Sequence, residues 1–386
     1  MKIGLVLAQP PGYSETFFNS KIKGLQDRGF EVILFCQNNS TNYSNCVVEI
    51  FPRKKINPII FFFTFLRVLV SLIPYFNRII KWYHLEKEGG IANFLSKVYF
   101  NAPLLKTKLD WIHYGFGTMA LGRETLAKAI GAKMAVSFRG FDIGIYPIKH
   151  PQCYGKLWKY LDKLHVISDD LHKLATVKGL PASIAVQKIT PAIDVHLFKT
   201  SKRNLTPTLL KFVTVGRLHW KKGFPDMLLA LKIIKDLGYD FKYHIIGEGK
   251  EYERIAYTAY ELGLKNQVKF LGKLTREEVK VEVESASIYL QYSVQEGFCN
   301  SVLEAQALGK LCIVSNAEGL AENVLNTQTG WVVEKLHPKK LAEKMIEVIH
   351  LPSTEKKEIS QAAIKRVREN FNIEKQQREF VDFYKI

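Results

Sequence analysis

Two glutamates, Glu296 and Glu304, are the residues whose type and spacing point most directly to chemistry. Residues 288–292 read as a strand and residues from about 300 to 308 have helical apolar spacing, so Gly297 marks the turn between them. At about 1.5 Å per residue the two carboxylates would lie roughly 12 Å apart, the order of the distance between the hexose and the ribose of a nucleotide sugar. Carboxylates accept hydrogen bonds from sugar hydroxyls, and a helix start attracts phosphate. The same spacing is also typical of a solvated helix face.

A second motif lies roughly 80 residues upstream and carries positive charge. The strand at 211–215 ends in Gly216 and Arg217, and Lys222 stands directly before Gly223 and an amphipathic helix. An arginine grips phosphate oxygens bidentately and a lysine acts as a point charge, so this loop is predicted to hold a leaving diphosphate without a metal. The alternative is two solvated side chains on a turn.

Together with three further segments, these motifs resemble the retaining glycosyltransferases of family 4, which have the GT-B fold. The further segments are 245–249, 268–272 and 319–331, and the resemblance covers nearly the whole chain. It implies that Glu296 contacts the donor sugar, Glu304 the nucleotide ribose, and Arg217 and Lys222 the diphosphate. Glu296, Arg217 and Lys222 are then the catalytic residues. The donor-binding set also contains Gly12, Gly216, Gly247, Glu248, Gly297, Phe298, Cys299, Asn300 and Ser301.

One part of that set has an equally plain alternative. Gly247, Glu248 and Gly249 resemble the start of a dinucleotide fingerprint, but Tyr252 stands where its third glycine would fall. A nicotinamide or flavin site is therefore not expected, and no cofactor is predicted. The turn either helps to form the nucleotide pocket, as in the family, or is only a tight connection from strand to helix.

The acceptor is expected on the N-terminal half. Gly12 permits close backbone approach, and residues 14–17 resemble a subgroup of family 4 that builds bacterial exopolysaccharide and surface polysaccharide. Glu15 either faces the acceptor or only complements a helix dipole. Many family members have a histidine where this chain has Arg139, which puts a mechanism through an imidazole in doubt, whereas front-face departure of the diphosphate needs no protein nucleophile. The predicted acceptor-side residues are Glu15, Thr16, His113, Arg139 and Asp142.

The elements that must position these residues alternate as in a parallel α/β protein. Strands are predicted at 2–8, 31–36, 47–51, 109–113, 133–138, 164–168 and 186–190, and then at 211–215, 241–246, 267–271, 288–292 and 311–315. We therefore expect an α/β GT-B fold with two Rossmann-like domains facing each other across a cleft. The expected ranges are 1–198 for the acceptor-side domain, 199–210 for a linker, 211–365 for the nucleotide-sugar domain and 366–386 for a tail that crosses back to the first domain.

Charge and composition restrict the partners. The chain has 386 residues, 55 of them Lys or Arg against 37 Asp or Glu, a formal net charge of +18. No nucleic-acid-binding motif accompanies this charge, so no nucleic acid partner is predicted. Residues 51–82 combine basic and aromatic residues but are interrupted before the roughly 20 apolar residues that a span requires, so they are predicted either to lie on an anionic membrane or to form the buried face of domain helices.

These observations favour a hexosyltransferase that takes a nucleotide-diphosphate sugar and passes the hexose to a saccharide acceptor on a lipid carrier. The five cysteines have no metal or disulfide pattern, and the N-terminus has no secretory segment, so we expect a cytoplasmic enzyme peripheral on the inner face of the membrane. No Asp-x-Asp motif follows a strand, so no metal is predicted. A GT-B-fold nucleotide-sugar epimerase or hydrolase is the alternative, and a non-catalytic basic binding protein is a third reading.

Overall fold

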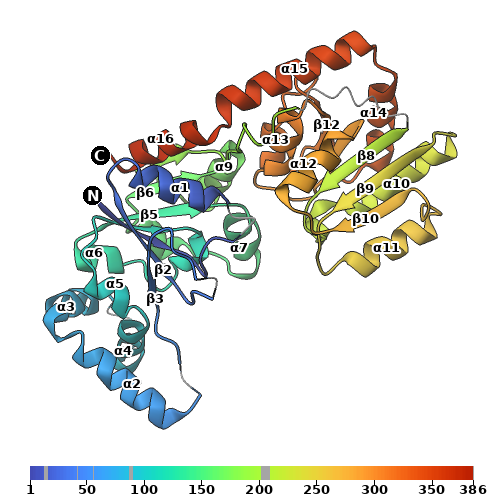
Figure 1. Ribbon diagram of the computed structural model, residues 1–386. Helices are drawn as coiled ribbons and strands as arrows, with labels where there is room; N and C mark the ends of the chain where they lie inside the picture. Colours follow the sequence, from blue (N-terminus) through green and yellow to red (C-terminus); the bar gives the residue numbers. More distant parts are fainter. Residues whose placement is uncertain (13–15, 41, 55, 87–89, 201–208, 386) are drawn as a thin grey trace. The chain divides into compact units, whose positions relative to one another are not determined.

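The computed structural model describes the chain except for residues 13–15, 41, 55, 87–89, 201–208 and 386. Two compact units form, each around a parallel sheet (Figure 1). The first contains residues 1–189 and 377–386, and the second contains residues 190–376. The segment 190–198, which the sequence suggested for the first domain, belongs to the second unit, where the Ile193 N–H donates to the Phe371 carbonyl at 2.9 Å. Most of the expected linker lies outside the described residues.

The first unit has a seven-stranded sheet in the order β3-β2-β1-β4-β5-β6-β7. Its strands are β1 (Lys2–Val6), β2 (Glu31–Cys36), β3 (Val47–Ile50), β4 (Trp111–Tyr114), β5 (Lys133–Phe138), β6 (Lys163–Val166) and β7 (Ala185–Lys188). Most read as nearly continuous apolar runs, because helices cover both faces of a parallel sheet and bury both sets of side chains. The strand order reverses between β1 and β4, and ligands of such sheets bind beyond the carboxyl ends of the strands at that point.

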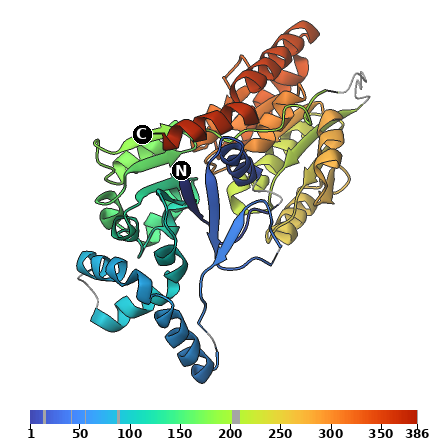
Figure 2. The same ribbon diagram turned by 60° about the vertical axis from the view of Figure 1, so that its left-hand side comes forward.

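The helices of the first unit follow the strands and continue into one insertion. Among the described residues they are α1 (Thr16–Gln26), α2 (Pro58–Val70), η1 (Ile73–Tyr75), α3 (Phe76–Leu85), α4 (Gly90–Phe100), α5 (Ala102–Lys106), η2 (Gly117–Met119), α6 (Leu126–Ile130), the π-helix η3 (Phe141–Ile145), α7 (Tyr146–Lys149), α8 (Gly155–Trp158) and α9 (Asp169–Val177). The segment α2–α5 lies between β3 and β4 and is here called the helical insert. In both ribbon views it extends away from the sheet of this unit (Figure 2).

The last helix, α16 (Ile373–Tyr384), completes the core of the first unit. Phe380, Phe383 and Tyr384 are fully buried there with the side chains of β1, β2 and α1. The Lys163 ammonium donates to the Phe383 carbonyl at 2.8 Å. The sheet of the first unit is therefore covered on one face by the C-terminal end of the chain.

The second unit has a six-stranded sheet in the order β10-β9-β8-β11-β12-β13. The strands are β8 (Leu210–Val215), β9 (Phe241–Ile246), β10 (Val268–Gly272), β11 (Ile288–Gln291), β12 (Leu311–Ser315) and β13 (Trp331–Val333). The helices are η4 (Trp220–Lys222), α10 (Phe224–Asp236), α11 (Tyr252–Glu261), α12 (Arg276–Glu284), α13 (Asn300–Ala307), η5 (Glu318–Glu322), α14 (Pro338–His350) and α15 (Ser353–Asn370). Here the order reverses between β8 and β11.

All strands expected from the sequence occur, with ends within about two residues. The strand β13 was not expected, because three residues directly after Gly330 give no alternation that a sequence pattern can detect. The predicted α/β class with two Rossmann-like domains is confirmed.

Candidate active site

Two loops meet at the strand-order reversal of the second sheet. Gly216 begins the loop after β8, and Ser293 and Glu296 lie on the loop after β11. Because β8 and β11 are neighbours and parallel, their carboxyl ends open at the same edge. Gly223 holds the two loops together: its φ is +64°, and a Cβ there would come within 2.1 Å of the Tyr292 carbonyl oxygen. Any other residue at 223 would push the loops apart.

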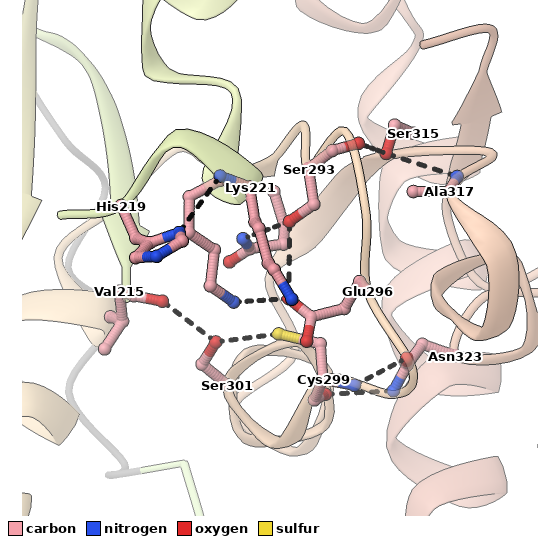
Figure 3. Close-up of polar contacts among 12 residues, drawn as sticks. Val215, His219, Lys221, Ser293, Glu296, Cys299, Ser301, Ser315, Ala317 and Asn323 are labelled. Atoms are coloured by element: carbon pink, nitrogen blue, oxygen red, sulfur yellow. Dashed lines mark hydrogen bonds and ion pairs between the residues drawn. The ribbon is translucent and has the colours of Figure 1, made fainter. Parts of the chain in front are cut away.

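Lys222 and Glu296 form an ion pair between these loops. Both side chains are largely buried, at 15% and 18% exposure. The Ser293 hydroxyl lies 3.4 Å from the same Glu296 oxygen, which the close-up of this region shows (Figure 3). Burial opposes charge on Lys222, but the attraction of Glu296 outweighs it and keeps the lysine pKa above its ordinary value. The structure thus brings together two residues that are 74 positions apart in the sequence.

The stem of Lys222 approaches the backbone of Gly216. A Cβ at position 216 would lie 3.3 Å from the lysine Cε, tighter than most side-chain contacts. Arg217 follows directly and is exposed. One largely buried, oriented ammonium and one exposed guanidinium therefore stand on the loop after β8, and they are suited to bind an anion with two or more phosphate groups.

The turn after β9 is braced against this loop. The φ of Gly247 is +134°, and a Cβ there would lie 2.1 Å from the Gly216 carbonyl oxygen. The Leu218 N–H donates to the Glu248 carbonyl at 2.9 Å. The glycine at 247 is thus explained by close backbone packing behind the cationic loop.

The start of α13 is anchored on both sides. The Cys299 N–H donates to the Asn323 side-chain oxygen at 3.0 Å, and the Asn323 amide donates back to the Cys299 carbonyl at 2.9 Å (Figure 3). The Ser301 hydroxyl donates to the Val215 carbonyl at 3.1 Å. Cys299 is the N-cap and makes no side-chain capping bond, so the first turn of α13, with Asn300 and Ser301, keeps the positive end of its dipole open to an anion. Phe298 is buried and packs against Phe371, with ring centroids 5.7 Å apart.

Glu304 lies about one turn after the start of α13. Its side chain is only partly exposed, and the burial of the rest raises the pKa of the carboxyl to about 7, although the charge of Arg276 acts in the opposite direction. Near neutral pH the group therefore exists in both protonation states. The ionised carboxyl can accept a hydrogen bond from a hydroxyl, and the protonated one can also donate a hydrogen bond to it.

The sequence reasoning missed Glu318. Its carboxylate accepts the Glu296 N–H at 2.8 Å and pairs with Lys335 at 3.0 Å. The Lys335 ammonium also donates to the Val294 carbonyl at 3.0 Å. The side chains of Glu318 and Lys335 therefore both hold the loop that carries Glu296 in place. Glu318 has φ +31°, an unfavourable region for a non-glycine residue. A charged residue directly before the Gly319 motif was the only available signal.

The predicted acceptor-side residues lie in the first unit, and two of them are fully buried. His113 contacts Lys21, Ser137 and Tyr384, with distances of 3.0, 2.7 and 2.5 Å. Burial and the charge of Lys21 hold the pKa of His113 well below its ordinary value, so the ring is neutral. Asp142 accepts backbone N–H groups from Gly117, Arg139 and Gly140 at 2.9–3.0 Å. These two side chains are engaged in holding loops, and a direct acceptor contact by either stays a prediction that burial does not favour.

Three other predicted residues of this unit lie at the ends of strands or in α1. The Arg139 guanidinium lies over the rings of Phe17 and Phe18, at 4.3 and 4.7 Å. Gly12 follows β1, and a Cβ there would meet nothing within 4 Å. Thr16 is the first residue of α1. Glu15 lies outside the described residues. Among the residues described in both units, no group of three or more His, Cys, Asp or Glu is arranged for a metal ion.

The predicted GT-B fold is confirmed, because solved glycosyltransferase structures share the fold of the two α/β units. Residues 198–366 match the family model described as glycosyl transferases group 1. The resemblance inferred from the sequence motifs is thereby confirmed.

Curated relatives agree with this match, and solved structures share the fold. The putative colanic acid biosynthesis glycosyltransferase WcaL of Escherichia coli K12 is 25% identical over 401 residues, 96% of each chain. The amylovoran biosynthesis glycosyltransferase AmsK of Erwinia amylovora is 25% identical over 264 residues, 66% of this chain and 65% of that protein. The crystal structure of Anabaena HepE with UDP-glucose has a TM-score of 0.74 at 16% identity, over 99% of this chain and 98% of that one.

Proposed function

We propose that this glycosyltransferase moves a hexose from a nucleotide-diphosphate sugar to a saccharide acceptor, with retention of the anomeric configuration, in the biosynthesis of an extracellular polysaccharide. The observation that carries the proposal is the largely buried Lys222–Glu296 pair beside Arg217 at the β8–β11 reversal. Support for the pathway comes from the names of WcaL and AmsK. Support for the donor comes from the UDP-glucose held by HepE.

In the proposed reaction, the bond between the anomeric carbon and the diphosphate oxygen breaks, and its electron pair goes to the diphosphate. Arg217 and Lys222 stabilise the charge that develops there. The acceptor hydroxyl attacks from the same face, and its proton passes to the departing phosphate oxygen. Glu296 holds hydroxyls of the transferred sugar, Glu304 holds the ribose, and the first turn of α13 faces the phosphates.

The pairing of Lys222 with Glu296 has a role in this scheme. Without donor, each group neutralises the other in a partly buried place, which avoids an isolated charge. When donor binds, the lysine gains phosphate and the glutamate gains sugar hydroxyls. The site is thus stable when empty and has both groups close to where the donor needs them.

We also propose that the acceptor is carried on a lipid and that the enzyme works as a peripheral protein at the inner face of the membrane. Support comes from the helical insert, which exposes many large apolar side chains. The free state of all five cysteines suits a reducing compartment.

The test is a donor screen followed by product analysis. UDP-, GDP- and ADP-sugars are compared by saturation-transfer NMR, and the best donor is incubated with lipid-linked saccharides. Transfer with an unchanged anomeric configuration supports the proposal. Free hexose or an epimerised donor as the main product, with and without acceptor, would instead favour the hydrolase or epimerase that the sequence left as an alternative.

A further inference from the structure

The helical insert carries an unusual share of the exposed apolar surface. Nearly half of the exposed large apolar side chains among the described residues lie between residues 56 and 95, about a tenth of the chain. In α2 no residue is buried, although its sequence is almost entirely apolar. Large exposed apolar patches on a folded protein mark sites of contact with a protein partner or a membrane.

The insert has two distinct faces, so this exposure is not the result of poor packing. On one face, Phe61 and Phe65 contact Tyr99, with ring centroids 5.5 and 5.3 Å apart. Trp82 is fully buried and donates to the Thr125 hydroxyl at 3.0 Å. Arg78 donates to the Leu105 and Thr107 carbonyls at 2.7 and 2.9 Å. The Tyr99 and Leu105 contacts hold the helices of the insert together, and the Trp82–Thr125 contact fixes the insert to the rest of the first unit.

The opposite face is here called the apolar face. It follows helical spacing along α2 and continues through η1 into α3, as expected for one side of an amphipathic element. Its residues are Ile59, Ile60, Phe62, Phe63, Leu66, Val70, Ile73 and Phe76, each 47–67% exposed. Phe61, which directly precedes Phe62 and Phe63 in the sequence, belongs to the packed face instead.

The charges around this face have one sign. Residues 50–85 contain Arg53, Lys54, Lys55, Arg67, Arg78 and Lys81 and no Asp or Glu. The next acid, Glu86, is buried and pairs internally with Lys97 and Lys156, at 2.5 and 2.8 Å. A partner that covers the apolar face must therefore be both apolar and anionic, which describes a bilayer that contains acidic lipids.

The length of the helices limits how they meet the bilayer. No single helix of the described residues is long and apolar enough to span it, and α2 with η1–α3 passes that test only as a pair bent by 51°. Their other face is already used for packing. An arrangement in the plane of the interface uses the apolar face and keeps Arg67 and Lys81, both exposed, at head-group level.

We infer that the helical insert is a monotopic anchor that lays its apolar face into an anionic bilayer. This inference rests on the proposed lipid-linked acceptor for its purpose, but its evidence is independent of the donor site. The anchor would hold the first unit at the surface where such an acceptor is found. Donor binding belongs to the second unit and does not depend on it.

The test is co-sedimentation of the full chain with vesicles of phosphatidylcholine alone or with about one third phosphatidylglycerol. The variant Phe62→Ser with Phe63→Ser removes two rings that are 60% and 64% exposed, so the fold should persist. The matched control is Tyr257→Ser with Tyr260→Ser, which removes two equally exposed rings from α11 of the second unit. We expect the wild type and the control to bind acidic vesicles, and the Phe variant to bind them at least about tenfold more weakly.

A second variant tests the charge. Arg67→Glu with Lys81→Glu should abolish the preference for acidic vesicles, and salt raised from about 0.1 to about 0.5 M should weaken wild-type binding. Equal loss in the α11 control, or a wild type that ignores both vesicle types, would overturn the anchor. So would a wild-type dimer that the Phe variant dissociates in gel filtration without any vesicle binding. Binding of UDP-, GDP- and ADP-sugars is measured on every variant, because a wild type that binds none of them would refute the proposed function instead.

Discussion

The carboxylate of Glu318 accepts the backbone N–H of Glu296 at 2.8 Å, and so one acidic side chain fixes the backbone position of another. Glu318 holds this contact at φ +31°, a conformation whose cost is of order 1–3 kcal/mol for a non-glycine residue. Lys335 holds the Glu318 carboxylate in this position through an ion pair at 3.0 Å. The geometry indicates that strain is accepted here to place Glu296 opposite Lys222.

Substitutions of Glu318 should separate stability from turnover. Glu318→Gly relieves the φ strain and loses the acceptor, so thermal stability should change by no more than about 1 kcal/mol while kcat falls by about tenfold. Glu318→Gln keeps an acceptor oxygen for the Glu296 N–H and should recover much of kcat. Denaturation curves and steady-state kinetics are compared for both variants. If turnover simply follows stability across them, Glu318 is only a structural residue.

Removal of either cation should weaken transfer. Arg217→Ala and Lys222→Ala should each lower kcat/KM by on the order of 10²-fold, because each loses a charge that stabilises the leaving diphosphate. Lys265→Ala, an exposed lysine of the same unit, is the control and should leave the rate unchanged. Wild-type kinetics in both test variants would rule out the diphosphate clamp.

The raised pKa of Glu304 predicts a pH-dependent stability. The unfolded carboxyl ionises near its model value of 4.5, whereas the folded one ionises at about 7. Between these values the folded state binds the extra proton, so this group's contribution to stability is present below about pH 4.5 and is lost as pH rises to about 7. Urea denaturation from pH 5 to 8 should show a fall for the wild type relative to Glu304→Gln. Parallel profiles for the two proteins would contradict the assigned burial.

Transfer is expected to survive chelation of divalent ions. Lys222 and Arg217 supply two positive charges on the loop after β8. These charges can stabilise the negative charge of the leaving diphosphate, as a bound metal ion does in other transferases. Turnover in EDTA should therefore stay within about twofold of the untreated enzyme. A loss that Mg²⁺ or Mn²⁺ restores would show that the two side chains are insufficient.

The sequence allowed the strands to be predicted because each is a short apolar run closed by turn residues, and these are local signals. Glycines such as Gly216 and Gly223 also stand out locally. The Lys222–Glu296 contact could not be read in the same way, because it depends on β8 and β11 being neighbours in the sheet. Glu318 was missed for a related reason: its partner is a backbone N–H, and backbone groups are the same at every position. The burial of His113 was also invisible, since it depends on Lys21 and Tyr384 from the two ends of the chain.

The course of α16 has a consequence for the order of synthesis. Phe380, Phe383 and Tyr384 fill the core that also contains β1 and α1, so the first unit needs residues that are synthesised after the whole second unit. The N-terminal half cannot complete its core before these residues are made, although the second unit then already has all its own strands. Until then one face of the first sheet stays uncovered, and a chain that stops before residue 377 would leave that face open permanently.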